Sequence, residues 1–105
     1  EEFKGALTEQ YVLQQFLARN IHPFYWSTEK STAEIDFIIQ LDGKLYPVEV
    51  KAEENLKAKS LKVFSERYKI PVSIRTSMSG YRKEDWLVNI PLYAIGFLNH
   101  ENTFY

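Results

Sequence analysis

The fold is decided by residues 34–51, which read EIDFIIQLDGKLYPVEVK. Two largely apolar runs in this stretch, 34–41 and 44–51, each have the length of a β-strand. Between them stands Asp42-Gly43, a dipeptide typical of the two-residue turn of a β-hairpin. The stretch therefore predicts two antiparallel strands joined by a tight turn.

A two-residue turn also fixes which residues face each other. Leu41 is then opposite Lys44, and Asp36 is opposite Glu49, with Cβ atoms roughly 4.5–5.5 Å apart. Lys51 lies two residues beyond Glu49 and points to the same face. The other face is apolar throughout and is expected to face the core; it carries Ile35, Phe37, Ile39, Leu41, Tyr46, Val48 and Val50.

Outside the hairpin, the chain alternates segments of helical and strand periodicity. Their order is helix, three strands, helix, strand and a short tail, which predicts an α/β fold with a mixed central sheet flanked by helices. Pro47, inside the third strand, is expected where its missing N–H faces no partner or at a bulge. The expected helices are 2–20, 60–68 and 91–98, and the expected strands besides the hairpin are 24–28, 72–76 and 86–88.

Length and composition exclude several classes of protein. The 105 residues fit one domain, and 45% hydrophobic residues exclude general disorder. The chain has no cysteine, which excludes disulfide scaffolds, cysteine-ligated zinc, iron–sulfur clusters and thiol nucleophiles. No apolar run approaches the ~18–20 residues of a membrane span, so we expect a soluble, cytoplasmic domain without a membrane partner. Because the sequence starts without methionine, it is expected to be part of a longer protein.

The acidic residues of the hairpin indicate a metal site. Two carboxylates directly opposite each other destabilise a sheet unless something intervenes, and a divalent cation takes carboxylate oxygens readily. A shared proton or the Lys51 ammonium would also reduce the repulsion. Glu9 lies at the centre of the apolar stripe of the first helix, so packing of that stripe on the sheet would bring Glu9 inside. The candidate site is therefore Glu9, Asp36, Glu49 and Lys51, and the structural alternative is an ordinary buried Glu–Lys pair.

A basic stretch follows the hairpin. Residues 51–83 carry nine basic and three acidic side chains, although the whole chain has a net charge of -1. Such a stretch either faces nucleic-acid phosphates or forms a solvated lysine-rich helix. The candidates for backbone contact are Lys57, Lys59, Ser60 and Lys62, with Ser60 also readable as a helix start. His22 and His100 are isolated and have no metal-ligand spacing.

Asp36, a spacer of twelve residues and then Glu49-Val50-Lys51 resemble the PD-(D/E)XK phosphodiesterase superfamily, which includes restriction endonucleases and Holliday-junction resolvases. Glu9 matches the acidic residue on that family's first helix, whereas Ile35 stands where the family often has proline. A wider string resembles the domain of unknown function found C-terminal to AAA+ ATPase modules in bacteria and archaea. It comprises Gly5-Ala6-Leu7-Thr8-Glu9, Tyr25-Trp26, Glu34-Ile35-Asp36-Phe37, Tyr46-Pro47-Val48-Glu49-Val50-Lys51-Ala52, Lys59-Ser60-Leu61 and Pro91-Leu92-Tyr93-Ala94-Ile95.

The resemblance implies a restriction-endonuclease-like α-β-β-β-α-β core and a nuclease that hydrolyses phosphodiesters of nucleic acid with Mg²⁺ or Mn²⁺. DNA is the favoured substrate, and the choice between DNA and RNA stays open from the sequence. Asp36, Glu49 and the backbone carbonyl of Val50 would be the metal ligands, and Glu9 would assist there or at a second ion. Lys51 would orient or deprotonate the attacking water. An AAA+ ATPase domain upstream in the same chain would be a partner.

Two other classes of function stay open from the sequence. The domain could be a catalytically silent module that binds nucleic acid or docks a partner and so regulates the ATPase. It could also serve oligomerisation, for which the aromatic-rich tail with Phe97, Phe104 and Tyr105 is the supporting feature. The intact Asp36, Glu49 and Lys51 favour the enzyme over both.

Overall fold

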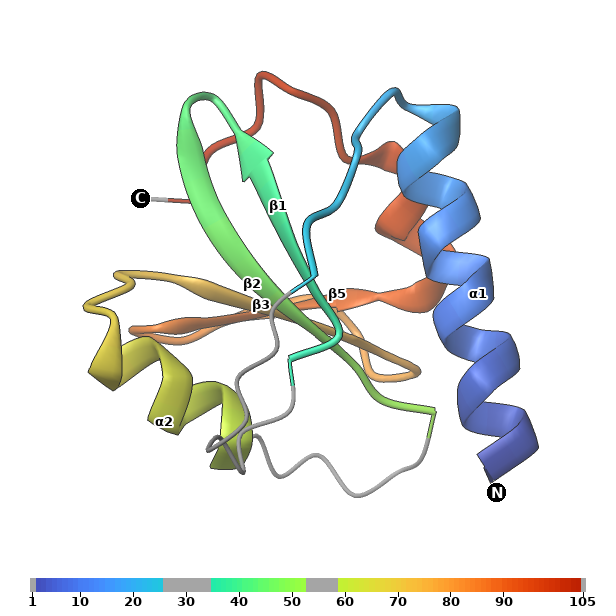
Figure 1. The fold of residues 1–105 in the computed structure, drawn as a ribbon, viewed down its shortest axis with the longest axis horizontal. Coiled ribbons are helices and arrows are strands. Elements are labelled where there is room, and N and C mark those ends of the chain that lie inside the picture. Colours follow the sequence, from blue (N-terminus) through green and yellow to red (C-terminus); the bar gives the residue numbers. More distant parts are fainter. Residues whose placement is uncertain (1, 26–34, 53–58, 105) are drawn as a thin grey trace.

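The structure, a computed structural model, describes residues 2–25, 35–52 and 59–104. Its frame is a five-stranded sheet with one α-helix on each face (Figure 1). The helices are α1 (Glu2–Ala18), α2 (Lys59–Arg67) and the short 3₁₀-helix η1 (Leu92–Phe97), and the strands are β1 (Phe37–Leu41), β2 (Lys44–Val50), β3 (Ser73–Ser77), β4 (Arg82–Lys83) and β5 (Leu87–Pro91).

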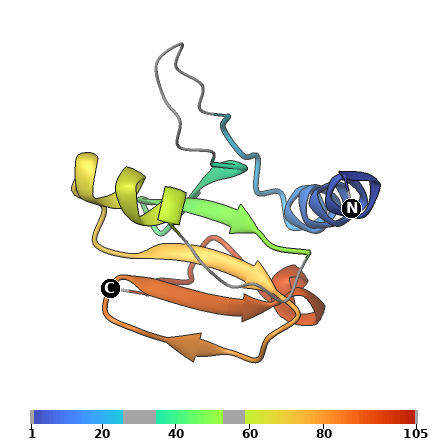
Figure 2. The same cartoon turned by 90° about the horizontal axis from the view of Figure 1, so that it is seen from below.

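The sheet is mixed, with the strand order β1-β2-β3-β5-β4. The hairpin strands β1 and β2 are antiparallel, β2, β3 and β5 run in parallel, and β4 returns antiparallel to β5 (Figure 2). The predicted α/β fold, with a mixed sheet flanked by helices, is thereby confirmed. None of the helices in the described part of the chain is both long and apolar enough to span a membrane.

The predicted hairpin register is confirmed. Leu41 pairs with Lys44 and Phe37 with Val48, and the turn residues Asp42 and Gly43 have φ angles of 51° and 73°. Positive φ at both central positions is the signature of a type I′ turn, whose twist matches that of the flanking strands. The turn chemistry therefore sets the alignment of every residue in the hairpin.

Pro47 is accommodated as expected. Its partner Ile38 exchanges both backbone hydrogen bonds with Phe24 on the outer side of β1, so Ile38 and Pro47 form a non-hydrogen-bonded pair. The ring nitrogen of Pro47 faces the β3 side instead, one residue before the β2–β3 register begins at Val48. The missing N–H therefore removes no bond from either ladder.

Two apolar clusters lie on the two faces of the sheet. The larger one joins α1 and η1 to the sheet, and its α1 residues Val12 and Phe16 are completely buried. The smaller one joins α2 to the sheet through Leu61 and Phe64. Ile35 belongs to this second cluster, so its predicted place on the same face as Phe37 is wrong. The physical reason is a bend at Asp36, which ends the regular alternation of the strand.

Three further expectations need correction. The strand expected over 24–28 is reduced, within the described residues, to a single bridge from Phe24 to Ile38, and 26–28 lie outside them. β4 was not expected at all, and β5 is longer than the predicted 86–88. The last helix is a 3₁₀-helix that starts after Pro91, because Pro91 has an extended backbone (φ -56°, ψ 143°) and ends β5 beside Ser77.

Candidate functional site

Asp36 occupies the bend just before β1. Its Oδ2 accepts a hydrogen bond of 2.7 Å from the backbone N–H of Val50. The β1–β2 register ends at Phe37 and Val48, and the next backbone donor of β2 on that side is Val50. The carboxylate thus accepts the bond that a regular antiparallel ladder would give to the carbonyl of Ile35. Asp36 and Glu49 are brought together at the end of the hairpin, but not as a ladder pair.

Glu49 is the most buried of the predicted acids, with only 8% of its surface exposed. Its Oε1 forms an ion pair of 3.2 Å with the Nζ of Lys51, which confirms that these two side chains share a face. Its Oε2 is buried and has no hydrogen-bond partner among the described residues. A buried carboxylate oxygen without a partner is energetically costly, which makes this atom the feature of the site that needs an explanation.

The ionisation of Glu49 reflects these neighbours. Burial is the largest cause and raises the pKa of Glu49 above its ordinary value. The hydrogen bond and the charge of Lys51 act in the opposite direction, and so does Arg75, whereas the charge of Asp36 raises the pKa further. The ionisation of Glu49 therefore depends on the negative charge of Asp36 and on the positive charges of Lys51 and Arg75.

Glu9 approaches the site from the other side of the sheet. It lines a cavity of about 290 Å³ together with Phe37, which packs against Phe16 of α1. Its pKa is raised, first by burial and second by the charge of Asp36. Within the described residues, no group of three or more acidic, histidine or cysteine side chains is arranged to hold a metal. The three acids therefore do not form one ligand set, although the charge of Asp36 acts on both of the others.

Arg75 on β3 is a site residue that the sequence reasoning missed. It is the register partner of Glu49, and only 8% of its surface is exposed. Its neighbours on the same face of β3 include Ser73, whose hydroxyl binds Ser65 of α2, which places Glu49 and Arg75 on the α2 face. The sequence does show a charged residue within the predicted strand 72–76, which could have marked Arg75 as a candidate. The parallel pairing that places it beside Glu49 cannot be predicted from the sequence.

The predicted nucleic-acid residues lie at the start of α2. Lys59 and Ser60 open the helix, and Lys59 and Lys62 are exposed to solvent. Lys57 lies outside the described residues. The exposed lysines are thus available for contacts with phosphates, which remains a prediction.

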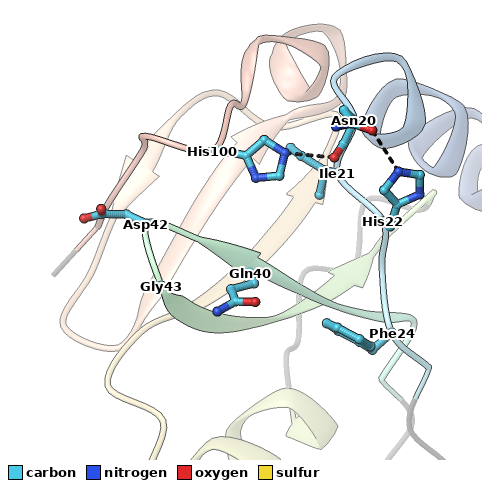
Figure 3. A pocket seen from close by; sticks show the side chains of 8 residues that line it. All are labelled: Asn20, Ile21, His22, Phe24, Gln40, Asp42, Gly43 and His100. Atoms are coloured by element: carbon cyan, nitrogen blue, oxygen red, sulfur yellow. Dashed lines mark hydrogen bonds between the residues drawn. The ribbon is translucent and has the colours of Figure 1, made fainter.

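A separate cavity of about 320 Å³ lies at the opposite end of the hairpin, beside Asp42 and Gly43 (Figure 3). The rings of His22 and His100 both point to Asn20, to its side-chain oxygen and its backbone carbonyl respectively. Neither this cavity nor the one beside Glu9 is lined by Glu49 or Lys51. Both histidines thus bond to Asn20, shortly after the end of α1.

The residues at the end of the hairpin fit a divalent cation bound by two carboxylates. The donor set is hard oxygen, and the buried Oε2 of Glu49 lacks the partner that such an ion would supply. Asp36 adds a second carboxylate whose charge Glu49 senses. The ion would be held by Asp36, Glu49 and the carbonyl of Val50, with Glu9 outside this set.

Comparison with known proteins identifies a family for most of the chain. The family model described as "Domain of unknown function (DUF4143)" matches residues 4–95. No curated protein and no solved structure matches the chain significantly. The matched range contains all four residues of the predicted catalytic site.

Proposed function

Since this chain belongs to the DUF4143 family, whose description states no activity, we propose from its site that it is a metal-dependent phosphodiesterase acting on nucleic acid. DNA is the preferred substrate in this proposal, and an AAA+ ATPase domain upstream in the same protein is its partner. The proposal rests on the chemistry of the residues at the end of β2.

The unpartnered Oε2 of Glu49 is the observation that carries the proposal. A carboxylate kept for structure alone would be expected to use both oxygens, because a buried acceptor without a donor is destabilising by about 1–3 kcal/mol. Here one oxygen is paired with Lys51 and the other has no partner among the described residues. A bound cation would satisfy that oxygen.

Each residue then has a role set by its position. Asp36 and Glu49 provide the negative charge that holds Mg²⁺ or Mn²⁺, an ion that stabilises negative charge on phosphate oxygens and lowers the pKa of water. Lys51 forms an ion pair of 3.2 Å with Glu49, and in this proposal it would orient or deprotonate the attacking water. Glu9, whose pKa the charge of Asp36 raises, would add negative charge and position solvent.

A catalytically silent module is the second candidate, and one observation favours it. Asp36 already accepts the hydrogen bond of Val50, and Lys51 already pairs with Glu49. Both groups therefore have structural partners without any bound ion. In that case the domain would bind nucleic acid or a partner of its ATPase without cleaving anything. A metal titration separates the two candidates.

The test is a calorimetric titration of Mn²⁺ into the parent domain, Glu49→Gln and Asp36→Asn, each checked for folding by circular dichroism. Both substitutions keep the shape and a hydrogen-bond acceptor while removing one charge. We expect binding in the parent and a loss of at least about tenfold in each variant, because one of two anionic ligands is removed. Asp42→Asn, at the distant turn, is the matched control and should bind like the parent. Equal binding in all four proteins, or no binding in any of them with and without a DNA strand present, would exclude the metal site.

Cleavage is measured next, on end-labelled DNA and RNA strands with Mg²⁺ or Mn²⁺. We expect the domain, or the longer protein joined to its ATPase, to cleave DNA, and Lys51→Met to abolish cleavage while retaining Mn²⁺ binding. Metal binding without cleavage in either form would favour the silent module.

A further inference from the structure

Four polar side chains stand next to one another across four adjacent strands. Glu49 of β2 is the register partner of Arg75 of β3, Arg75 is the partner of Asn89 of β5, and Asn89 is the partner of Arg82 of β4. Because register partners point to the same face of a sheet, this row crosses the α2 face. The candidate metal ligand Glu49 is at one end of it.

Arg75 is fixed in this row by Asn89. The Nε of Arg75 donates to the Oδ1 of Asn89 at 2.9 Å, and both residues are buried. The amide of Asn89 is itself oriented, because its Nδ2 donates to the carbonyls of Ser79 and Gly80 and its Oδ1 also accepts from Ser77. A guanidinium held this way cannot swing into solvent without breaking buried hydrogen bonds. Its charge is therefore a permanent part of the surroundings of Glu49.

Glu49 is flanked by two cations as a result. Lys51 is 3.2 Å from its Oε1, and Arg75 stands on the neighbouring strand, where its charge favours the ionised form of Glu49. A divalent ion that approaches Glu49 meets the repulsion of both. Lys51 has a flexible stem and is partly exposed, so it can move aside, whereas Arg75 cannot.

A phosphodiester group relieves this repulsion. It carries one negative charge, which offsets the positive charge of a guanidinium fixed below the protein surface. A phosphate placed near Arg75 would reduce the positive potential at Glu49 and so strengthen cation binding. By thermodynamic reciprocity, the bound cation would strengthen phosphate binding by the same factor.

We propose that Arg75, fixed by Asn89, makes divalent-cation binding at Glu49 depend on a phosphodiester group. This inference rests on the proposed metal-dependent function and adds a rule for its regulation: the site is weakly loaded with metal until nucleic acid arrives. In this role Arg75 changes the affinity for the cation through its charge and is not itself a ligand of the cation.

The test measures Mn²⁺ affinity by calorimetry, with and without an eight-residue thymidine DNA strand that is checked to be intact afterwards. In the parent, we expect the strand to raise the affinity about fivefold or more, within the usual range of coupling between sites. A matched strand with an uncharged methylphosphonate backbone should give no increase. This comparison needs no variant, and an equal increase with both strands would overturn the proposal.

Substitution of Arg75 gives the second arm. In Arg75→Gln the affinity for Mn²⁺ alone should rise, and the additional increase caused by the DNA strand should disappear. Arg75→Lys keeps the charge but lacks the guanidinium that Asn89 holds, so its increase should fall between those of the parent and Arg75→Gln. Arg75→Met serves if the Gln variant does not fold, which circular dichroism shows. Unchanged Mn²⁺ affinity in these charge-removing variants would overturn the proposal.

The two proposals fail in different ways. A parent that binds no Mn²⁺ with or without DNA removes the metal-dependent function and this inference with it. A parent that binds Mn²⁺ equally well with and without DNA keeps the function and removes only the role of Arg75.

Discussion

The carboxylate of Asp36 accepts a hydrogen bond from the backbone N–H of Val50, at 2.7 Å and across fourteen residues of sequence. Val50 stands between Glu49 and Lys51, so this bond joins the two halves of the acidic motif directly. It also replaces a ladder bond that the bend at Asp36 has removed. The aspartate therefore has a structural task that is independent of any metal.

The structural role of Asp36 predicts that two substitutions of this residue differ in stability. Asp36→Ala leaves the partly buried N–H of Val50 without its acceptor and should lower the free energy of unfolding by about 1–3 kcal/mol. Asp36→Asn keeps an oxygen acceptor and should lower it by less. Urea denaturation followed by circular dichroism measures both. If the Ala and Asn proteins were equally stable, the hydrogen bond to Val50 would contribute nothing.

Lys51 should control the ionisation of Glu49. Its hydrogen bond and charge both lower the pKa of Glu49, against the larger effect of burial. Lys51→Met should therefore raise the pKa of the Glu49 carboxyl further, as followed by its ¹³C chemical shift in an NMR titration. Lys44→Met is the matched control, since Lys44 pairs with Asp42 at the other end of the hairpin. An unchanged Glu49 titration in the Lys51 variant would show that the ion pair does not persist in solution.

The raised pKa values of Glu9 and Glu49 predict how stability depends on pH. Each folded-state pKa lies above the ordinary value of 4.5, so above pH 4.5 the folded state holds more protons than the unfolded state. These two groups therefore make stability fall as the pH rises from 4.5 through the raised values. Glu9→Gln removes one titrating group and should make that fall less steep, as measured by urea unfolding at a series of pH values. Glu66→Gln, on the exposed side of α2, is the control, and an equal effect of both substitutions would contradict the role of Glu9.

The lysines of α2 should contribute to nucleic-acid affinity without sequence preference. Lys59 and Lys62 are exposed on the first turns of the helix. For double-stranded DNA, the slope of log affinity against log salt becomes shallower by about 0.9 for each phosphate that the protein no longer neutralises. Lys59→Ala and Lys62→Ala should therefore weaken binding of any duplex and flatten its salt dependence, as read by fluorescence anisotropy. Lys44→Ala provides the control, and an unchanged slope in the α2 variants would place the DNA elsewhere.

The hairpin was predictable from sequence because its turn is a local signal. Asp42 and Gly43 fixed the register, and with it the shared face of Glu49 and Lys51. The same alternation failed at Ile35, because a bend is decided by where the Asp36 carboxylate finds a donor. Periodicity carries no information about such a side-chain hydrogen bond.

The pairing of strands far apart in the chain was the other feature that could not be predicted from the sequence. Arg75 and Asn89 join Glu49 through parallel neighbours, and nothing in a single sequence fixes which parallel strands are adjacent. The separation of Glu9 from Glu49 has a related origin, since the helix with Glu9 packs on the face opposite to Arg75. Local chemistry thus made these acids candidates, and sheet topology decided which of them lie on the same face of the sheet.

Asn89 should be among the polar residues on which the stability of this fold depends most. It is 2% exposed, it accepts from Arg75 and Ser77, and its amide donates to two backbone carbonyls. Asn89→Ala leaves several buried groups without partners and should lower the free energy of unfolding by roughly 2–4 kcal/mol. Ser77→Ala removes one hydroxyl from the same network and should cost about 1 kcal/mol. Urea denaturation of both proteins measures the difference; an Asn89→Ala protein as stable as Ser77→Ala would mean that Asn89 does not hold Arg75, and Arg75 would then lose its fixed place beside Glu49.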